Sequence, residues 1–405
     1  MRYSLRLISS RSSSTIGEYL RKAGVDPEGI AIMKSKAEDL VIRVDGVPAA
    51  AANIIKQQLL SIGGDAAVHR EVITGHPPFS TVYIFTDRRR IAALSEKLSY
   101  QPFGLGELAE GVVRLVEAAE HPPSSIPLPG DRSIDLSNGP VVMGIINATP
   151  DSFSDGGLFL EPSRAVERAL EMIDEGADII DIGGESSRPG SGELSVQEEL
   201  SRVAPILEGL SGETDVPISI DTRKAKIAEA AIGLGATVIN DISGLTHDPG
   251  MAEAAARSGA AVIVMHMQGT PETMQDDPFY EDVLSEIIEW FETRTASLIS
   301  AGVAKDKIII DPGIGFGKRL VDNLDILRGM GDFRGLGFPI MVGYSRKSFI
   351  GMITGREPTD RLWGGLAALG SALDGGAQIV RVHDVRETID FIEVWKAITK
   401  KGNGS

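Results

Sequence analysis

Short runs of valine and isoleucine recur along the last two thirds of the chain, separated by stretches whose apolar residues have helical spacing. Continuous apolar strands that alternate with helices are typical of parallel strands buried on both faces of a sheet. The pattern predicts eight strands, at 141–147, 178–184, 217–222, 237–242, 261–267, 307–313, 339–345 and 378–384. We therefore expect an α/β fold, a (β/α)8 TIM barrel over 136–400, with a doubly wound open sheet as the alternative.

The first part of the chain has a different organisation. Apparent strands at 40–44, 66–70 and 81–85 alternate with helical patterns such as 49–60, which predicts a small α+β domain over 1–120. The sequence of this domain indicates no function. The stretch HPPSSIPLPGD, which begins at His121, carries four prolines and two serines and predicts a linker over 121–135.

The composition indicates a globular protein of a reducing compartment. The 405 residues contain no cysteine, which excludes disulfides, thiolate catalysis and cysteine-ligated zinc. No stretch approaches the ~20 apolar residues that a membrane span needs. The start, MRYSLRLISSRSSS, is rich in Arg and Ser like an organelle transit peptide, but Tyr3, Leu5 and Leu7 alternate as in a first strand. We expect a cytoplasmic protein.

The net charge of −17 belongs to the second part of the chain, where 25 Lys and Arg face 43 Asp and Glu after residue 125. An acidic body repels nucleic acids and anionic membranes, so we expect neither as a partner. A ligand that carries phosphate would have to be held by a few local cations.

Each predicted barrel strand is apolar at its start and polar at its end, and in a barrel these ends converge on the face that carries active sites. A single Asp or Asn after a strand is often only a turn former or a helix cap. Several cations at one shared mouth repel one another and therefore indicate an anionic ligand. The polar residues at the strand ends include Asn147, Asp181, Glu185, Arg188, Asp221, Asn240, Asp241, His266, Asp311, Ser345, Arg346, Lys347, Arg381, His383 and Asp384.

Two features of the sequence resemble a nucleotide-binding phosphate loop and a zinc site, but neither has the full pattern of such a site. The glycines of PGIGFGK, 312–318, resemble a phosphate loop, but Arg319 stands where Ser or Thr would bind a metal. His266 and His383 are candidate metal ligands, yet six histidines without HxxH or HExxH spacing argue against a zinc site.

The remaining inventory of side chains indicates two kinds of recognition. Asp and Asn at several strand ends suit a flat heterocycle with adjacent N–H donors, because a carboxylate accepts two parallel hydrogen bonds. Arg188, Arg381 and His383 suit a phosphate or diphosphate, and Asn147 offers a hard oxygen for Mg²⁺, which usually bridges phosphates. We therefore expect a heterocycle that carries a diphosphate leaving group.

The motifs closely resemble those of the dihydropteroate synthase family, in that family's order, over about residues 140–395. They read NATPDSFSDGG, DIIDIGGESSRPGS, ISIDT, VINDISG, MHMQGTP, IIDPGIGFGK, GYSRKSFIG and RVHDV. The resemblance implies condensation of 6-hydroxymethyl-7,8-dihydropterin diphosphate with p-aminobenzoate, which releases diphosphate and forms 7,8-dihydropteroate. It does not extend to residues 1–125. Homodimerisation is a further expectation from the family.

The resemblance also implies roles for individual residues. The pterin ring would be held by Asp221, Asn240, Asp311 and Lys347. Asn147 would bind Mg²⁺ together with the diphosphate, which would be gripped by Arg188, Arg381 and His383. The p-aminobenzoate pocket would be bordered by Ser187, Pro189, Phe316 and Ser345. Catalysis would rest on Lys347, Arg381, His383 and Arg188, with two mobile loops, Thr149–Leu158 and Glu185–Glu193, closing over the substrates.

The chemistry suggests a dissociative substitution, because loss of diphosphate from a methylene on an electron-rich pterin leaves a stabilised cation. Three alternatives stay open. The acceptor would be a ribosylated aminobenzene phosphate in a methanopterin-type pathway. A methyltetrahydrofolate:corrinoid methyltransferase shares the pterin grip but needs no diphosphate site, so SRKS at 345–348 and RVHDV at 381–385 argue against it. A non-catalytic pterin-binding protein would not need the complete motif set.

Overall fold

The computed structural model describes residues 21, 27–28, 30, 40–148, 162–186 and 192–399. The chain divides into two compact units, Met1–Glu117 and Ala118–Ser405. Within the described part of the chain, no helix is both long and apolar enough to cross a membrane.

The first unit is a small sheet with one face covered by helices. Strand β3 (Phe79–Thr86) lies between β1 (Leu40–Pro48) and β2 (Asp65–Ala67), and both pairings are antiparallel. Alternate residues of β3, such as Val82 and Ile84, are fully buried, because successive side chains of a strand point to opposite faces. They pack against apolar residues of the helices, which are α3 (Ala49–Ser61), α4 (Arg88–Ser99) and α5 (Leu105–Glu120).

The second unit is a barrel of eight parallel strands. They are β6 (Val141–Asn147), β7 (Ile179–Gly183), β8 (Ile218–Asp221), β9 (Val238–Asp241), β10 (Ala261–Met265), β11 (Ile308–Asp311), β12 (Met341–Val342) and β13 (Ile379–Val382). The sheet runs from β11 through β10, β9, β8, β7, β6 and β13 to β12, and an isolated parallel bridge between Ile310 and Ile340 joins its two edges. The predicted (β/α)8 barrel is confirmed, and the open sheet is not observed among the described residues.

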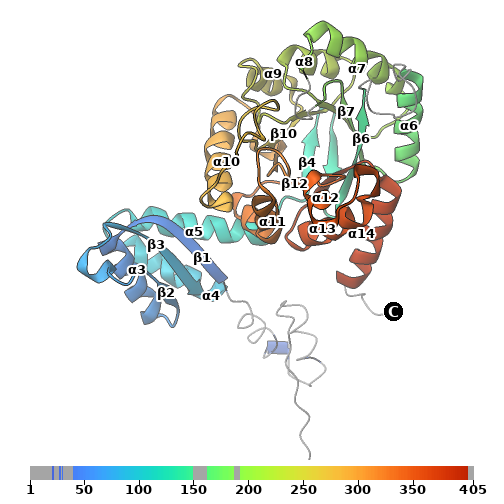
Figure 1. Cartoon of the computed structure of the whole chain (residues 1–405). Coiled ribbons are helices and arrows are strands. Elements are labelled where there is room, and N and C mark those ends of the chain that lie inside the picture. Colours follow the sequence, from blue (N-terminus) through green and yellow to red (C-terminus); the bar gives the residue numbers. More distant parts are fainter. Residues whose placement is uncertain are drawn as a thin grey trace, which may run out of the picture. The chain divides into compact units, whose positions relative to one another are not determined.

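Nine helices of the described chain surround this barrel (Figure 1). They are α6 (Pro162–Asp174), α7 (Val196–Leu210), α8 (Ala225–Gly233), α9 (Met251–Ser258), α10 (Val283–Ser300), α11 (Leu320–Arg328), α12 (Ser348–Thr354), α13 (Leu362–Asp374) and α14 (Val385–Thr399). Their apolar faces cover outward strand residues such as Ile180 and Ile182, which are fully buried. The strands are therefore apolar on both faces, as the sequence pattern predicts.

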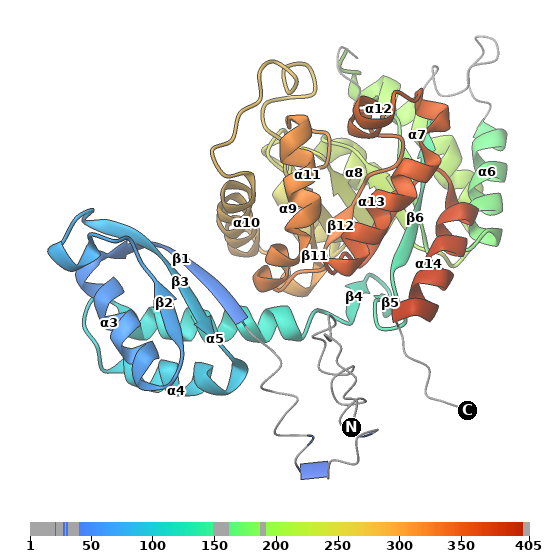
Figure 2. The same cartoon turned by 60° about the horizontal axis from the view of Figure 1, so that its bottom comes forward.

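The segment predicted as a linker, 121–135, is instead largely a β-hairpin. Strands β4 (Ser125–Leu128) and β5 (Arg132–Asp135) pair antiparallel, and they lie at the amino-terminal end of β6 (Figure 2). Ile126, Leu128 and Ile134 pack with the inward residues of the barrel strands and close its floor. The prolines mislead here because a two-stranded hairpin consists only of edge strands, which tolerate proline.

The barrel interior has an apolar lower part and a polar upper part. The inward residues at the strand starts, among them Val141, Ile179 and Ile379, belong to the apolar cluster above the hairpin. Two residues further along their strands, with side chains on the same face, stand Asp181 and Arg381. This change from apolar to polar inward positions places the candidate site at the carboxyl ends of the strands.

Candidate active site

Arg381 bridges two acidic side chains inside the barrel mouth. Its Nε donates to Asp181 Oδ2 at 2.6 Å, and its Nη2 donates to Asp221 Oδ2 at 2.7 Å. Asp181 on β7 is fully buried, whereas the Asp221 side chain at the end of β8 is 18% exposed. Asn240 on β9 also donates to Asp181 Oδ2, at 3.1 Å. Four strands thus supply one connected polar layer.

Asp311 and Lys347 extend this layer on the other side of the mouth. Asp311 ends β11 and is buried, and its Oδ1 accepts the backbone N–H of Gly313 at 2.8 Å. Lys347 follows β12, with its Nζ 3.8 Å from the centre of the Phe316 ring. An ammonium group over an aromatic face is a favourable cation–π arrangement. The predicted pterin residues Asp221, Asn240, Asp311 and Lys347 therefore all lie at one end of the barrel.

Burial governs the protonation of these groups. It raises the pKa of Asp221 to about 7, against the opposing charge of Arg381. Burial also raises the pKa of Asp311, although the hydrogen bond from Gly313 acts to lower it. Burial lowers the pKa of Lys347 to about 8, and the nearby Arg381 charge acts in the same direction. The mouth thus holds two acids with raised pKa values and a lysine with a lowered pKa, and perturbed pKa values of this kind are typical of active sites.

His383 follows β13 and faces the turn that carries Lys347. Its Nδ1 lies 3.0 Å from Ser345 Oγ, and its backbone N–H donates to the same oxygen at 3.3 Å. Burial, together with the charges of Arg346 and Arg381, lowers the pKa of His383 to about 3. The imidazole is therefore neutral at pH 7.

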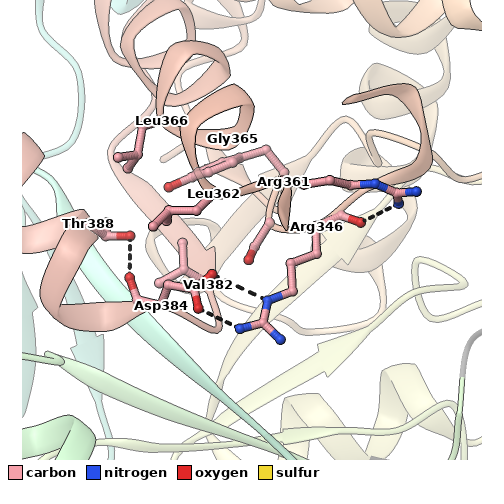
Figure 3. A pocket seen from close by; sticks show the side chains of 10 residues that line it. Arg346, Arg361, Leu362, Gly365, Leu366, Val382, Asp384 and Thr388 are labelled. Carbon is pink, nitrogen blue, oxygen red and sulfur yellow. Dashed lines mark hydrogen bonds and ion pairs between the residues drawn. The ribbon is translucent and has the colours of Figure 1, made fainter. Parts of the chain in front are cut away.

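A small pocket lies next to this histidine, between the end of β13 and α13 (Figure 3). Arg346 pairs with Asp384 through both Nη2, at 2.5 Å, and Nε, at 3.3 Å. Arg361 Nη1 donates to the carbonyl of Arg346 at 3.0 Å, and Arg346 has a left-handed φ of 59°. These contacts join the turn after β12 to the end of β13, so they fix Ser345 relative to His383.

The loop after β11 is held by a buried lysine that the sequence analysis did not assign to the site. Lys318 is 4% exposed, and its Nζ donates to the carbonyl oxygens of Phe316 at 3.0 Å and His266 at 3.2 Å. The same Nζ lies 3.1 Å from His266 Nδ1, and burial lowers the pKa of Lys318 to about 7. The lysine of the PGIGFGK motif, 312–318, therefore holds the loop that carries Phe316 in place.

A second unassigned cluster lies at the carboxyl ends of β7 and β8. Glu185 accepts from Arg223 Nη2 at 2.5 Å and also pairs with Lys224, which reaches Glu199 Oε2 at 2.7 Å. Burial opposes ionisation of Glu185, but the hydrogen bonds from Lys224 and Arg223 outweigh it and lower its pKa. Leu194 N–H donates to Glu185 Oε2 at 3.3 Å. The cluster ties together the two described ends of the β7–α7 connection.

The remaining predicted residues fall into two groups. Asn147 ends β6 and is half-buried, and Ser345 and Phe316 stand on the loops after β12 and β11. Ser187, Arg188 and Pro189 lie outside the described residues, as does the loop Thr149–Leu158. The loop Glu185–Glu193 is described only at 185–186 and 192–193. Predictions for these segments stay predictions.

Asp181 was visible in the sequence but was not assigned a role. The run DIIDIGG alternates, so Asp181 shares a face with Ile179 and Gly183 and points inward. That periodicity is the signal that identifies it. The cluster around Glu185 had no comparable signal, because its partners stand 38 and 39 residues away in the sequence.

Comparison with known proteins agrees with this geometry. A family model described as pterin binding enzyme matches residues 143–383. The dihydropteroate synthase of Escherichia coli strain K12 is 48% identical over 265 residues, covering 65% of this chain and 93% of that protein. A crystal structure of dihydropteroate synthase from Xanthomonas albilineans in complex with 7,8-dihydropteroate is 40% identical, with a TM-score of 0.62, covering 69% of this chain and 100% of that one.

One relative also includes much of the first unit. A probable bifunctional folylpolyglutamate synthase/dihydropteroate synthase of Halobacterium salinarum is 38% identical over 379 residues, covering 93% of this chain and 45% of that protein. The chain thus spans less than half the length of this bifunctional relative. The match of the family model over more than half of the chain and the high coverage of the synthases show the family. The chain belongs to the dihydropteroate synthase family of pterin-binding enzymes, which are transferases.

Proposed function

We propose that the barrel condenses 6-hydroxymethyl-7,8-dihydropterin diphosphate with p-aminobenzoate to give 7,8-dihydropteroate and diphosphate. One observation carries the proposal: acceptors on β8, β9 and β11 converge with Arg381 and Lys347 at one mouth. A flat heterocycle needs the acceptors, and a diphosphate needs the cations. The X. albilineans structure with bound 7,8-dihydropteroate supports the same reading.

The pterin would lie against Asp221, Asn240, Asp311 and Lys347. Asp221 and Asp311 offer carboxylate oxygens to the N–H donors of the guanidine-like edge of the ring, and bidentate pairing of this kind adds geometric specificity. Because burial brings the pKa of Asp221 to about 7, a ligand that donates hydrogen bonds to its carboxylate favours the ionised form.

The diphosphate would be held by Arg381, His383, Asn147 and Arg188. Arg381 supplies a permanent charge with a planar set of donors, which suits phosphate oxygens. His383 is neutral without a ligand, so it would donate a hydrogen bond and take up a proton only as negative charge accumulates nearby. Arg188 is assigned on the sequence resemblance alone.

Mg²⁺ is the proposed cofactor, and the donor set fits a metal bound largely through the substrate. Among residues 40–148, 162–186 and 192–399, no group of three His, Cys, Asp or Glu side chains is arranged to hold a metal ion. Asn147 offers a carbonyl oxygen at the end of β6, which suits an ion that keeps waters and bridges phosphates. Bound there, Mg²⁺ would neutralise charge on the diphosphate.

The amine would enter beside Phe316 and Ser345, with Ser187 and Pro189 completing its pocket. The Phe316 ring already lies against Lys347, so this aromatic side chain stands between the pterin residues and the proposed amine pocket. An arylamine nitrogen is a nucleophile without prior deprotonation, so the site needs no strong base. We propose dissociative substitution, in which Arg381 stabilises the departing diphosphate.

The test is release of diphosphate and formation of dihydropteroate when purified protein, Mg²⁺, dihydropterin diphosphate and p-aminobenzoate are mixed. A parallel reaction with a ribosylated aminobenzene phosphate identifies the acceptor. Arg381→Ala should lower turnover by roughly 10³-fold, because it removes charge stabilisation of the leaving group. If Arg381→Ala keeps turnover and diphosphate affinity, the assignment of the leaving-group site is wrong.

Two further proposals concern the oligomeric state and the cellular location. We propose a homodimer, for which the exposed apolar side chains Met352, Ile353 and Trp363 on α12 and α13, at 67%, 57% and 78%, offer a candidate face. Sedimentation velocity of the full chain tests the stoichiometry. The cytoplasmic location stays a prediction, which fractionation of the source cells would test.

A further inference from the structure

We propose that Asp181 is a positioning residue that keeps hold of Arg381 while the guanidinium moves from Asp221 to the diphosphate of the substrate. The inference rests on the proposed function and deepens it. In the structure, the Arg381 guanidinium contacts both Asp221 and Asp181, and in this proposal Asp181 is the contact that it keeps.

The contacts of Arg381 separate into a deep one and a shallow one. Nε donates to Asp181, whose side chain is 0% exposed, and Nη2 donates to Asp221, which is 18% exposed at the mouth. Asp181 is also fixed by Asn240 on β9. A ligand that enters from the mouth therefore meets the contact with Asp221 first, and the contact with Asp181 stays underneath.

The guanidinium on Asp221 occupies the position proposed for the substrate. A guanidinium and the guanidine-like edge of a pterin present the same planar N–H donors, so both compete for the Asp221 carboxylate. When the pterin takes Asp221, Nη2 is released. It then becomes available to the diphosphate on the same substrate, so pterin binding and diphosphate binding are coupled through one side chain.

Asp181 has a second carboxylate oxygen that can accept a further hydrogen bond. Its Oδ2 accepts both hydrogen bonds, and its Oδ1 has no hydrogen-bond partner within the described residues although it is buried. An unpartnered buried carboxylate oxygen is costly and calls for a reason. A guanidinium that turns about Nε can reach the second oxygen, so Asp181 can hold it in both positions.

The experiment is a double-mutant cycle read by calorimetric binding of inorganic diphosphate with Mg²⁺ to the full chain. Asp181→Asn keeps the side-chain volume and removes the charge. It should weaken diphosphate binding by about tenfold, while the same change in an Arg381→Gln background should have less than about a twofold effect. In turnover assays, Asp181→Asn should raise KM for dihydropterin diphosphate and lower kcat, and leave KM for p-aminobenzoate unchanged.

Two controls separate positioning from a general loss of structure. Asp178→Asn makes the same change beside the opposite end of β7, where the carboxylate accepts Val142 N–H at 2.8 Å, and it should leave diphosphate binding unchanged. If Asp181→Asn does not fold, Arg381→Lys replaces it, because one ammonium group cannot span Asp181 and Asp221. It should weaken diphosphate binding by about tenfold although the charge is kept.

The outcomes are separable from those of the proposed function. Additive effects in the cycle, a Lys variant that binds like Arg, or wild-type protein that does not bind diphosphate would overturn the role of Asp181. A coupled cycle in a protein that forms no dihydropteroate would overturn the proposed reaction and leave the coupling between Asp181 and Arg381 in place.

Discussion

At the scale of single residues, the site places Arg381 beside side chains whose ionisation is opposed by burial, such as Asp221 and His383. Arg381 is charged because a guanidinium stays protonated in proteins, and it pairs with Asp181 and Asp221. His383 is neutral because burial and two arginines oppose its protonation. Arg381 and His383, two of the four residues predicted to hold the diphosphate, therefore differ in charge: the guanidinium is cationic, and the imidazole is neutral at pH 7.

The low pKa of His383 predicts how stability depends on pH. Its pKa falls from 6.5 to about 3 on folding, so between these values the unfolded chain binds a proton that the folded chain does not. The free energy of unfolding should therefore fall as the pH falls from about 6.5, by up to about 1.4 kcal/mol per pH unit from this group. His383→Gln should remove that contribution.

The measurement is urea unfolding of wild type and His383→Gln at pH 7, 6 and 5. The variant should gain stability relative to wild type with each step down. His247→Gln serves as the control, because its ring is 33% exposed and contacts Glu193. A constant difference between wild type and His383→Gln over this range would show that the folded protein protonates His383 normally.

At the scale of elements, sequence periodicity predicted each barrel strand to within one or two residues, except β12. That strand contains only Met341 and Val342, although the apolar run covers 339–345. The predicted run extends beyond the strand because Tyr344 packs in the hydrophobic core, although its backbone does not pair with a neighbouring strand. The contact between Asp181 and Arg381 lay beyond prediction, since it joins residues 200 positions apart. Local patterns report which face a residue occupies and not which partner it meets.

The loop after β11 requires a glycine at position 313, and this requirement predicts how much stability an alanine there would cost. Gly313 has a φ of 70°, and a Cβ there would stand 2.0 Å from the backbone oxygen of His266. Gly355 has almost the same φ, 69°, with nothing within 4 Å of a Cβ. Both alanine variants bear the left-handed backbone cost of about 1–2 kcal/mol, but only Gly313→Ala must also displace a backbone carbonyl.

We therefore expect Gly313→Ala to lose at least about 2 kcal/mol more unfolding free energy than Gly355→Ala, measured by urea titration. It should also impair activity, because the same loop carries Phe316 and is held by Lys318. Equal losses in the two variants would mean that the loop can move away from His266 without cost.

At the scale of the whole molecule, the chain joins a catalytic barrel to a unit with its own core. The first unit buries residues such as Ile55, Leu59 and Ile84 in a cluster separate from those of the barrel. The E. coli synthase aligns over 93% of its length with 265 residues of this chain, which is 65% of the chain. The net charge of −17 repels anions at long range, so a bound anion would need local cations such as Arg381.

This division predicts different outcomes for two truncations. A chain that starts at Ala118 keeps the hairpin β4–β5 and should fold and retain dihydropteroate synthase activity within a fewfold of the full chain. A chain that starts at Ser137 also loses Ile126, Leu128 and Ile134, which close the barrel floor. Exposing that floor should cost several kcal/mol, since removing a single large apolar side chain from a core already costs about 2–5 kcal/mol.

Thermal unfolding followed by circular dichroism, with activity measured on the same samples, compares the two chains. The 19 residues from Ala118 to Leu136 are the difference between them, so any loss in the shorter chain belongs to the hairpin and its approach. If the chain from Ala118 fails to fold, the barrel depends on the first unit. If the chain from Ser137 is as stable as the longer one, the hairpin covers the floor without stabilising it.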